Sequence, residues 1–334
     1  MYLKFYGLLE KPFNSTPDPK FLYLTSAHRE ALAQLVYGVQ EHLGFIVLTG
    51  EVGTGKTTLL RALLKRLDQD TAVAFIFSST LPFDEIVEYM LEDFGIKMAE
   101  TRVQRLVALN QFLIERRRSG LNTVVIFDEA QNLSPETLEQ IRLLSNFETT
   151  TDKLLQILLV GQPELKAKLQ GPELRQLRQR VGLRCTIAPL DHRETGDYIN
   201  HRLRIAGAYD TGLFTNSAIE RIGRYSDGIP RVINTLCDHC LLIGYATQVP
   251  RIDRSIVERA ITYLEEGLEE GGKLPSGLRA GLAAMVDAPS MWRWAAALAA
   301  VVAGVAAAVT WQLDVITSNA LSGVMEAFAR WWGK

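Results

Sequence analysis

Apolar runs alternate with amphipathic stretches over about the first 190 residues of the chain. Five short, largely apolar runs predict buried strands at 45–48, 72–77, 122–127, 154–160 and 184–188. Between them, apolar residues recur at helical spacing and predict helices at about 83–94, 101–118, 135–147 and 173–180. Strands that alternate with helices form parallel sheets with helices on both faces. The pattern therefore predicts an α/β core over 26–190 with a five-stranded parallel sheet.

The regions before and after this core follow different patterns. Residues 1–25 are rich in aromatic residues and proline, which is typical of an extended arm that packs without regular structure. A helix is expected from Ala27 to about His42, with Ser26 as its N-cap. Beyond the core, helical patterns follow at about 192–206, 216–226, 230–247 and 252–266. These patterns predict a small all-α lid domain over 191–266.

A long apolar segment lies near the C-terminus. The stretch from Trp294 to Trp311 carries no charge, and as a helix it would span about 27 Å, close to the thickness of a bilayer's hydrocarbon core. Tryptophans at both ends are typical of interfacial anchors. We therefore expect a single transmembrane helix over 291–312. Because the segment is rich in alanine, a helix that is buried in an oligomer or lies on the membrane remains an alternative.

The segments that flank this expected helix have different compositions. Residues 267–290 begin with a run of glycine and glutamate, which is typical of a flexible linker. Arg279 and Arg293 favour a cytoplasmic location for everything that precedes the helix. Residues 313–334 have the apolar spacing of an amphipathic C-terminal tail.

Charge and cysteine content narrow the range of partners and compartments. A net charge of −2 argues against binding of DNA or anionic lipid by the whole surface. Three cysteines are too few for a disulfide framework and fit a reducing compartment. Cys237 and Cys240 have the spacing of a metal-binding pair, but they lie among apolar residues of a predicted helix. We therefore expect core packing there and no structural metal.

The strongest chemical signal is a glycine followed by four residues and then Gly-Lys-Thr, between a predicted strand and a predicted helix. Glycines permit the dihedrals that turn backbone N–H groups toward phosphates. Lys56 is expected to meet the β- and γ-phosphates of ATP, and the Thr57 hydroxyl to hold Mg²⁺. The expected nucleotide-binding residues of this phosphate loop are Gly50, Glu51, Val52, Gly53, Thr54, Gly55, Lys56, Thr57 and Thr58.

Two carboxylates follow the third predicted strand. Asp128 is placed to hold Mg²⁺, either directly or through water. Glu129, one residue later, is placed to orient and deprotonate the attacking water. Because ligands of parallel sheets lie beyond the carboxyl ends of the strands, the phosphate loop, this pair and Gln162 are expected to share one edge of the sheet.

Several motifs together resemble a known family. They are Asp128-Glu129-Ala130-Gln131, Gly161-Gln162-Pro163-Glu164-Leu165, Gly228-Ile229-Pro230-Arg231, and the segment Phe5-Tyr6-Gly7-Leu8 with its following prolines. Over about 1–265 the chain is similar to the AAA+ ATPases of the general secretion pathway A (ExeA-like) family, which includes exopolysaccharide-associated relatives. The resemblance implies an ATP-driven, dimer- or ring-forming ATPase that is often anchored in the membrane through its C-terminal part.

The same resemblance implies roles for three further residues. Gln162 would be the sensor that reads the γ-phosphate, and Arg231 would reach the nucleotide from the lid. Arg180, or else Arg178, would complete the site of a neighbouring subunit and act there on transition-state charge. The alternatives stay open at this point: Arg231 as an ordinary helix-start residue, and the arginines as a solvated basic face.

These observations predict a membrane-anchored AAA+ ATPase of the bacterial inner membrane, with its ATPase domain in the cytoplasm. We expect homo-oligomers, and ATP hydrolysis coupled to assembly or remodelling of a secretion or exopolysaccharide complex of the envelope. The alternative is a nucleic-acid-binding AAA+ ATPase, similar to the transposition target-selection type. Its DNA-facing residues would be Arg102, Arg105, Arg116, Arg117 and Arg118. A nucleotide switch that does not hydrolyse ATP is disfavoured by Glu129.

Overall fold

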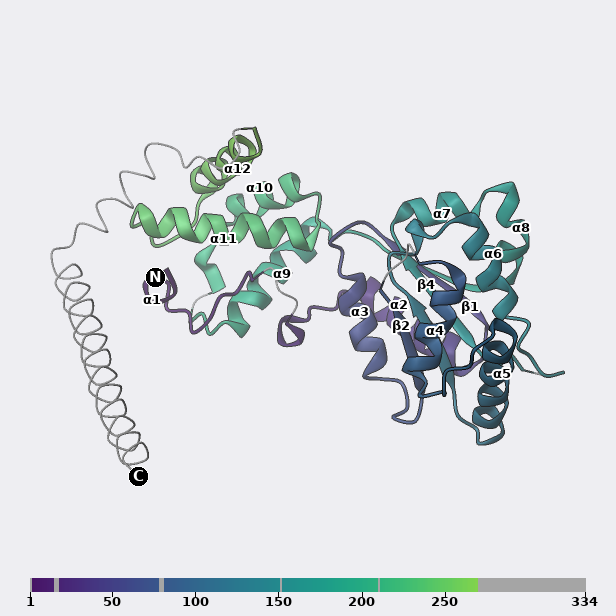
Figure 1. The fold of residues 1–334 in the computed structure, drawn as a ribbon. Coiled ribbons are helices and arrows are strands. Elements are labelled where there is room, and N and C mark those ends of the chain that lie inside the picture. The colour runs from purple at the N-terminus through teal and green to yellow at the C-terminus, as the bar shows by residue number, and fades with distance from the viewer. Residues whose placement is uncertain (1, 15–17, 78–80, 151, 210, 270–334) are drawn as a thin grey trace, which may run out of the picture. The chain divides into compact units, whose positions relative to one another are not determined.

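The computed structural model describes residues 2–14, 18–77, 81–150, 152–209 and 211–269 (Figure 1). The chain divides into two compact units, 1–265 and 266–334, and almost all of the second lies outside the described residues. Among the described residues, no helix is both long and apolar enough to cross a bilayer. The expected transmembrane helix at 291–312 and the tail at 313–334 lie outside the described residues.

A five-stranded parallel sheet forms the centre of the first unit, as expected. Its strands are Phe45–Gly50 (β1), Ala72–Ile76 (β2), Thr123–Phe127 (β3), Gln156–Gly161 (β4) and Val181–Ile187 (β5). They lie in the order β2-β3-β4-β1-β5, and every adjacent pair is parallel. The fifth strand begins earlier than predicted, because this edge strand alternates exposed and buried side chains and its apolar run is shorter than the strand itself.

Helices cover both faces of this sheet (Figure 1). They are Ser26–Gln40 (α2), Lys56–Leu64 (α3), Phe83–Asp93 (α4), Arg102–Arg118 (α5), Pro135–Leu144 (α6), Pro163–Leu169 (α7) and Arg175–Arg180 (α8). Strand β1 contributes side chains to the apolar clusters on both faces of the sheet, because successive side chains of a strand point to opposite faces. Phe45 and Val47 pack in the apolar cluster with α4 to α8. Ile46 and Leu48 pack in the cluster with α2 and α3.

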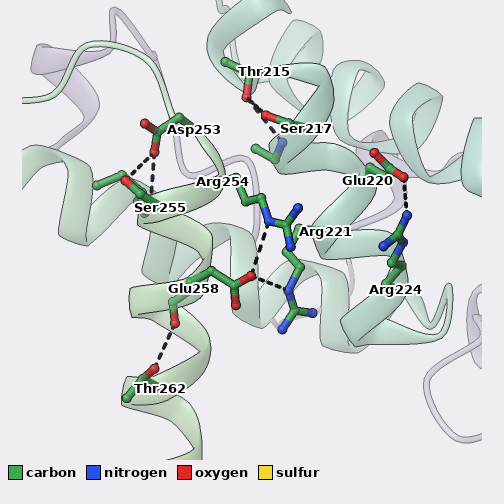
Figure 2. Close-up of polar contacts among 12 residues, drawn as sticks. Thr215, Ser217, Glu220, Arg221, Arg224, Asp253, Arg254, Ser255, Glu258 and Thr262 are labelled. Atoms are coloured by element: carbon green, nitrogen blue, oxygen red, sulfur yellow. Dashed lines mark hydrogen bonds and ion pairs between the residues drawn. The ribbon is translucent and has the colours of Figure 1, made fainter.

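The second part of this unit is helical. It contains His192–Ile205 (α9), Asn216–Ser226 (α10), Pro230–Ala246 (α11) and Arg254–Glu269 (α12). Helix α12 thus extends into the stretch expected to be linker. Glu258 of α12 accepts hydrogen bonds from Arg221 of α10, at 2.8 Å, and from Arg254, at 3.5 Å (Figure 2). This carboxylate therefore ties α12 to α10.

The N-terminal arm is more ordered than the sequence predicts. It contains a short helix, Tyr2–Phe5 (α1), and a 3-10 turn, Pro19–Phe21. The prediction of an arm without regular structure was therefore wrong for these two segments. Tyr2 of α1 and Phe21 of the 3-10 turn are buried in the same apolar cluster as α9 and α11. Buried aromatic rings contribute much of the stability of a hydrophobic core. The arm is therefore part of the core of the helical part.

Polar contacts hold the arm to these helices. The Tyr2 hydroxyl donates a hydrogen bond to Asp238 Oδ1 at 2.5 Å. Arg202, only 6% exposed, donates from Nε to the carbonyl oxygen of Pro12 at 2.5 Å, and its guanidinium lies over the Phe21 ring, 4.8 Å from the ring centre. Buried arginines require such acceptors. Arg202 therefore anchors the arm to α9.

Candidate nucleotide-binding site

The phosphate loop connects β1 directly to α3. Gly53 and Gly55 have φ angles of +83° and +99°, a region that favours glycine. Gly55 is the N-cap of α3 and makes no side-chain cap hydrogen bond. The first N–H groups of a helix lack intrahelical partners, so this helix start can bind an anion.

Lys56 lies beneath the loop. Its side chain is buried, and Nζ donates to the carbonyl oxygens of Gly50 at 2.8 Å and Glu51 at 3.0 Å. Burial lowers the pKa of Lys56, and the nearby carboxylates Glu129 and Asp128 oppose that shift. These two carbonyl oxygens therefore hold the lysine side chain within the loop.

Thr57 and Asp128 form a pair of oxygen donors. Thr57 Oγ1 lies 3.4 Å from Asp128 Oδ2, and Asp128 is 8% exposed. Burial raises the pKa of Asp128 despite a hydrogen bond from the Glu129 backbone N–H. Mg²⁺ prefers carboxylate and hydroxyl oxygens, and a buried carboxylate gains from a nearby cation. The two residues therefore fit a magnesium ion.

Glu129 and Gln162 meet across the neighbouring strands β3 and β4. Glu129 has a φ angle of +52°, which is rare for a residue other than glycine. Its Oε2 accepts a hydrogen bond from Gln162 Nε2 at 3.1 Å. Burial raises the pKa of Glu129, but hydrogen bonds from Gln131 and Gln162 and the charge of Lys56 lower it overall. The glutamate is therefore held as a carboxylate.

A cavity of about 400 Å³ opens beside the phosphate loop. Its wall includes Val52 to Thr58, Glu129 and Arg231. Asp128 contacts the lining residue Thr57, and Gln162 contacts the lining residue Glu129. The backbone N–H of Arg231 donates to the carbonyl oxygen of Gly53 at 3.3 Å. The structure thus brings Arg231 to the phosphate loop.

Several lining residues were not among those predicted from the sequence. They come from the arm, as Leu22, Tyr23 and Leu24, and from the helical part, as Tyr198, Arg202 and Asn234. The aromatic composition of the arm, just upstream of the phosphate loop, could have indicated the lining residues of the arm. No sequence feature indicated those of the helical part, because only the tertiary fold brings α9 and α11 to the cavity.

His28 was also missed. It is buried at the start of α2, where its Nδ1 lies 2.8 Å from Thr25 Oγ1 and its Nε2 lies 3.2 Å from the carbonyl oxygen of Thr54. Thr25, rather than the expected Ser26, is the N-cap of this helix. His28 therefore connects the end of the arm to the phosphate loop.

Arg180 and Arg178 lie away from this site. Arg180 Nη1 donates to Ser145 Oγ at 2.5 Å, and Arg178 Nη1 donates to the carbonyl oxygen of Gln170 at 3.1 Å. Val181 pairs with Phe45 at the start of β1, whereas the phosphate loop follows Gly50 at its end. The length of β1 separates the two ends by about 17 Å. Neither arginine is therefore part of the site formed by its own chain.

Cys237 and Cys240 are fully buried in the apolar cluster of the helical part. Burial raises the pKa of both thiols. Metal binding requires the thiolate form, which this environment disfavours.

Comparison with known proteins gives a family for part of the chain and a relative for most of it. Residues 39–169 match the AAA domain family. Over 297 residues the chain is 40% identical to general secretion pathway protein A of Aeromonas hydrophila, a match that covers 88% of this chain and 54% of that protein. The chain thus spans about half the length of this curated relative.

Two solved structures from Aeropyrum pernix share the fold. The ORC2 protein, in ADPNP–ADP complexes, superimposes with a TM-score of 0.56 at 17% identity over 76% of this chain and 71% of that chain. The ORC1 protein in complex with DNA gives a TM-score of 0.56 at 15% identity, over 77% of this chain and 70% of that chain. At such low identity these matches show the fold alone. With the sheet order, the phosphate loop and the sequence match taken together, the chain is an AAA-domain relative of general secretion pathway protein A.

Proposed function

We propose that this protein is an ATPase that binds ATP with Mg²⁺ in the cavity beside the phosphate loop and hydrolyses it. The hydrogen bond between Glu129 and Gln162 carries the proposal. It places a candidate base and a candidate γ-phosphate sensor together on the same edge of the sheet as Lys56. A carboxylate held in this way fits a general base that activates water.

Each residue has a defined task in this proposal. Lys56 and the N–H groups at the start of α3 bind the phosphates. Thr57 and Asp128 would hold Mg²⁺, which supplies neutralising charge at the phosphoryl group. Glu129 orients the attacking water and accepts its proton. Gln162 donates from its amide to the γ-phosphate, and Arg231 approaches the nucleotide from the helical part.

The active form in this proposal is a homo-oligomer. Arg180 lies at the opposite end of β1 from the phosphate loop of its own chain, so it can complete only the site of a neighbour. An arginine that acts in trans makes hydrolysis depend on assembly. Arg178 is the second choice for this role.

The cellular role in this proposal follows from the relative and from the C-terminal sequence. We infer that the protein couples ATP hydrolysis to assembly or remodelling of an envelope complex of the secretion or exopolysaccharide type. The relative is a general secretion pathway protein, and the sequence from Trp294 to Trp311 fits a single span of the inner membrane. The ATPase part would then lie in the cytoplasm.

A DNA-binding role is the second candidate, because the ORC1 protein, which shares this fold, is in complex with DNA in its structure. The basic helix α5 gives it little support. Arg102, Arg105 and Arg117 form ion pairs with acidic residues of this chain. Arg116 donates to the carbonyl oxygens of Asp70 and Asn122. Charges that are neutralised within the chain contribute less to phosphate binding.

Two variants of the full chain test the enzymatic part of the proposal. Lys56→Ala should weaken ATP binding at least about tenfold, because a hydrogen bond to a charged group contributes about 1.5–3 kcal/mol. Glu129→Gln should still bind ATP, while phosphate release falls at least about a hundredfold. Lys65→Ala is the matched control, since Lys65 is exposed at the other end of α3. ATP turnover that survives Glu129→Gln would remove Glu129 as the base.

The cellular part is tested by fractionation and by partner addition. The full chain should resist carbonate extraction from membranes, and duplex DNA should leave its ATP turnover unchanged. A readily extracted protein whose turnover rises with DNA in a salt-sensitive way would favour the nucleic-acid role.

A further inference from the structure

Gln131 lies between the candidate base and the candidate sensor and uses both ends of its side-chain amide. Its Nε2 donates to Glu129 Oε2 at 2.6 Å. Its Oε1 accepts from the backbone N–H of Gln162 at 3.1 Å. Because Gln162 Nε2 also donates to Glu129 Oε2, the three residues form a closed hydrogen-bonded unit that includes the backbone N–H of Gln162.

The surrounding structure keeps Gln131 in place. It belongs to a 3-10 turn, Ala130–Asn132, between Ala130 and Leu133, which are both fully buried. Lys168 of α7 donates from Nζ to the backbone carbonyl oxygens of Gln131 at 2.5 Å and Leu133 at 2.7 Å. A mobile surface glutamine would have no such support.

Two backbone features make room for this arrangement. A Cβ atom at Gly161 would lie 2.7 Å from Gln131 Oε1, so any larger residue there would displace the Gln131 amide. Glu129 adopts its left-handed conformation at the N-cap of the turn. Strain of this kind persists only where the surrounding contacts enforce it, and it is frequent at functional sites. Here the enforced conformation brings the Glu129 carboxylate to both amides.

The hydrogen bonds distinguish the two oxygens of Glu129. Both amide donors bond to Oε2, and within the described part of the chain Oε1 has no hydrogen-bond partner. Glu129 lines the cavity. One oxygen is thus anchored to the protein, and the other is left for a water molecule.

We propose that Gln131 is a positioning residue that couples the base to the γ-phosphate sensor. Its amide N–H fixes the orientation of the Glu129 carboxylate, while its amide oxygen fixes the backbone that carries Gln162. This inference rests on the proposed ATPase function and adds a residue to it. Correct orientation of a catalytic group contributes strongly to rate and little to ground-state binding.

Two substitutions separate the two ends of the amide. Gln131→Glu retains an oxygen that accepts from the Gln162 N–H but replaces the donor to Glu129 by a second carboxylate oxygen. Gln131→Leu removes both. Each should lower kcat at least about tenfold and change the Kd of a fluorescent ATP analogue less than about twofold. Exposed Gln111 on α5 provides the control, Gln111→Leu, which should leave both values unchanged.

Hydrogen exchange of the nucleotide-free full chain gives a readout that is independent of activity. The backbone amide of Gln162 should exchange faster in Gln131→Leu and keep its protection in Gln131→Glu. In a double-mutant cycle, Gln131→Leu and Gln162→Ala should lower kcat by less than the product of their separate effects.

The outcomes are distinct from those that test the proposed function. Wild-type kcat in Gln131→Glu would overturn the positioning role, and increased kcat would show that Gln131 restrains Glu129. Multiplicative losses in the double mutant would overturn the coupling. If Glu129→Gln also retained turnover, the assignment of the base itself would fail, whatever Gln131 does.

Discussion

Nε2 of His28 lies 3.2 Å from the carbonyl oxygen of Thr54, so a residue in the first turn of α2 supports the phosphate loop directly. The other ring nitrogen lies 2.8 Å from Thr25 Oγ1, which fixes the plane of the ring. Because Thr25 is also the N-cap of α2, the loop, the helix and the arm meet at one imidazole.

Replacement of this imidazole should loosen the phosphate loop. His28→Ala is expected to raise the Kd for ATP about fivefold, which corresponds to the loss of one hydrogen bond of about 1 kcal/mol. Isothermal titration with a slowly hydrolysed ATP analogue measures the change. His192→Ala, at an exposed position on α9, is the control. An unchanged Kd in His28→Ala would mean that the loop keeps its shape without the histidine.

The close approach of Gly53 to the helical part provides a second prediction. A Cβ atom there would lie 2.6 Å from Arg231 Cβ, and the backbone has a φ angle of +83°. Gly53→Ala should therefore raise the Kd for ATP at least about tenfold, since backbone strain of about 1 kcal/mol adds to a steric clash. Gly95→Ala is the control, because Gly95 also has a positive φ angle, +69°, but lies after α4, with nothing within 4 Å of the added Cβ, and should leave the Kd unchanged. Equal losses in both variants would argue against the contact.

Arg202 should control how firmly the arm is held. Arg202→Leu leaves the carbonyl oxygen of Pro12 without its donor, at a cost of about 1–3 kcal/mol for a buried acceptor. Trypsin should then cut after exposed Lys20, next to the Phe21 ring that Arg202 covers, at least about five times faster, since local opening controls proteolysis. Arg204→Leu, at an exposed position on the same helix, should not change the cutting rate.

Arg180 is expected to act on a neighbouring subunit. Arg180→Ala should bind ATP normally but hydrolyse it at least about a hundredfold more slowly. A mixture of Arg180→Ala with Lys56→Ala should be more active than either variant alone, because one mixed interface combines an intact loop with an intact arginine. Arg175→Ala, exposed on the same helix, serves as the control. A mixture as inactive as its components would contradict action in trans.

Glu258 should make the attachment of α12 depend on pH (Figure 2). The hydrogen bond from Arg221, followed by its charge, holds the pKa of Glu258 below the ordinary value of 4.5. A carboxylate with a lowered folded-state pKa stabilises the fold fully above pH 4.5, and this contribution is lost as the pH falls through the folded-state pKa. Glu258→Gln should therefore lower Tm slightly at pH 7, and the difference should disappear in acid. Glu265→Gln, exposed on the same helix, should match the wild type throughout.

Local sequence was enough to predict the phosphate loop and the strand end with two carboxylates. The glycines, Lys56 and Thr57 are adjacent in the chain, and their backbone requirements leave few alternatives. Parallel strands then bring Glu129 to the same edge, because the carboxyl ends of β1, β3 and β4 are in register. The sheet edge could therefore be predicted without any tertiary information.

The contacts of Gln131, His28 and Arg202 could not be predicted in the same way. Each joins segments that are distant in sequence, and nothing in the local pattern predicts these contacts, although Gln131 belongs to one of the motifs that carry the family resemblance. Gln131 reaches Gln162 only because β3 and β4 are neighbours. The sequence also gave no reason to place the arm in the core of α9 and α11, since its apolar residues fit any nearby core equally well.

The packing of the arm has a consequence for how the chain folds during synthesis. Pro12 and Arg202 are 190 residues apart, and Tyr2 and Asp238 are 236 apart. At a synthesis rate of about 5–20 residues per second, the arm leaves the ribosome about 10–50 s before its partners exist. The sheet and its covering helices can form during that delay, whereas the aromatic residues of the arm have no core to pack into until α9 and α11 have been made. The helical part, which is translated after the sheet, therefore completes its folding by capturing the segment that was made before everything else.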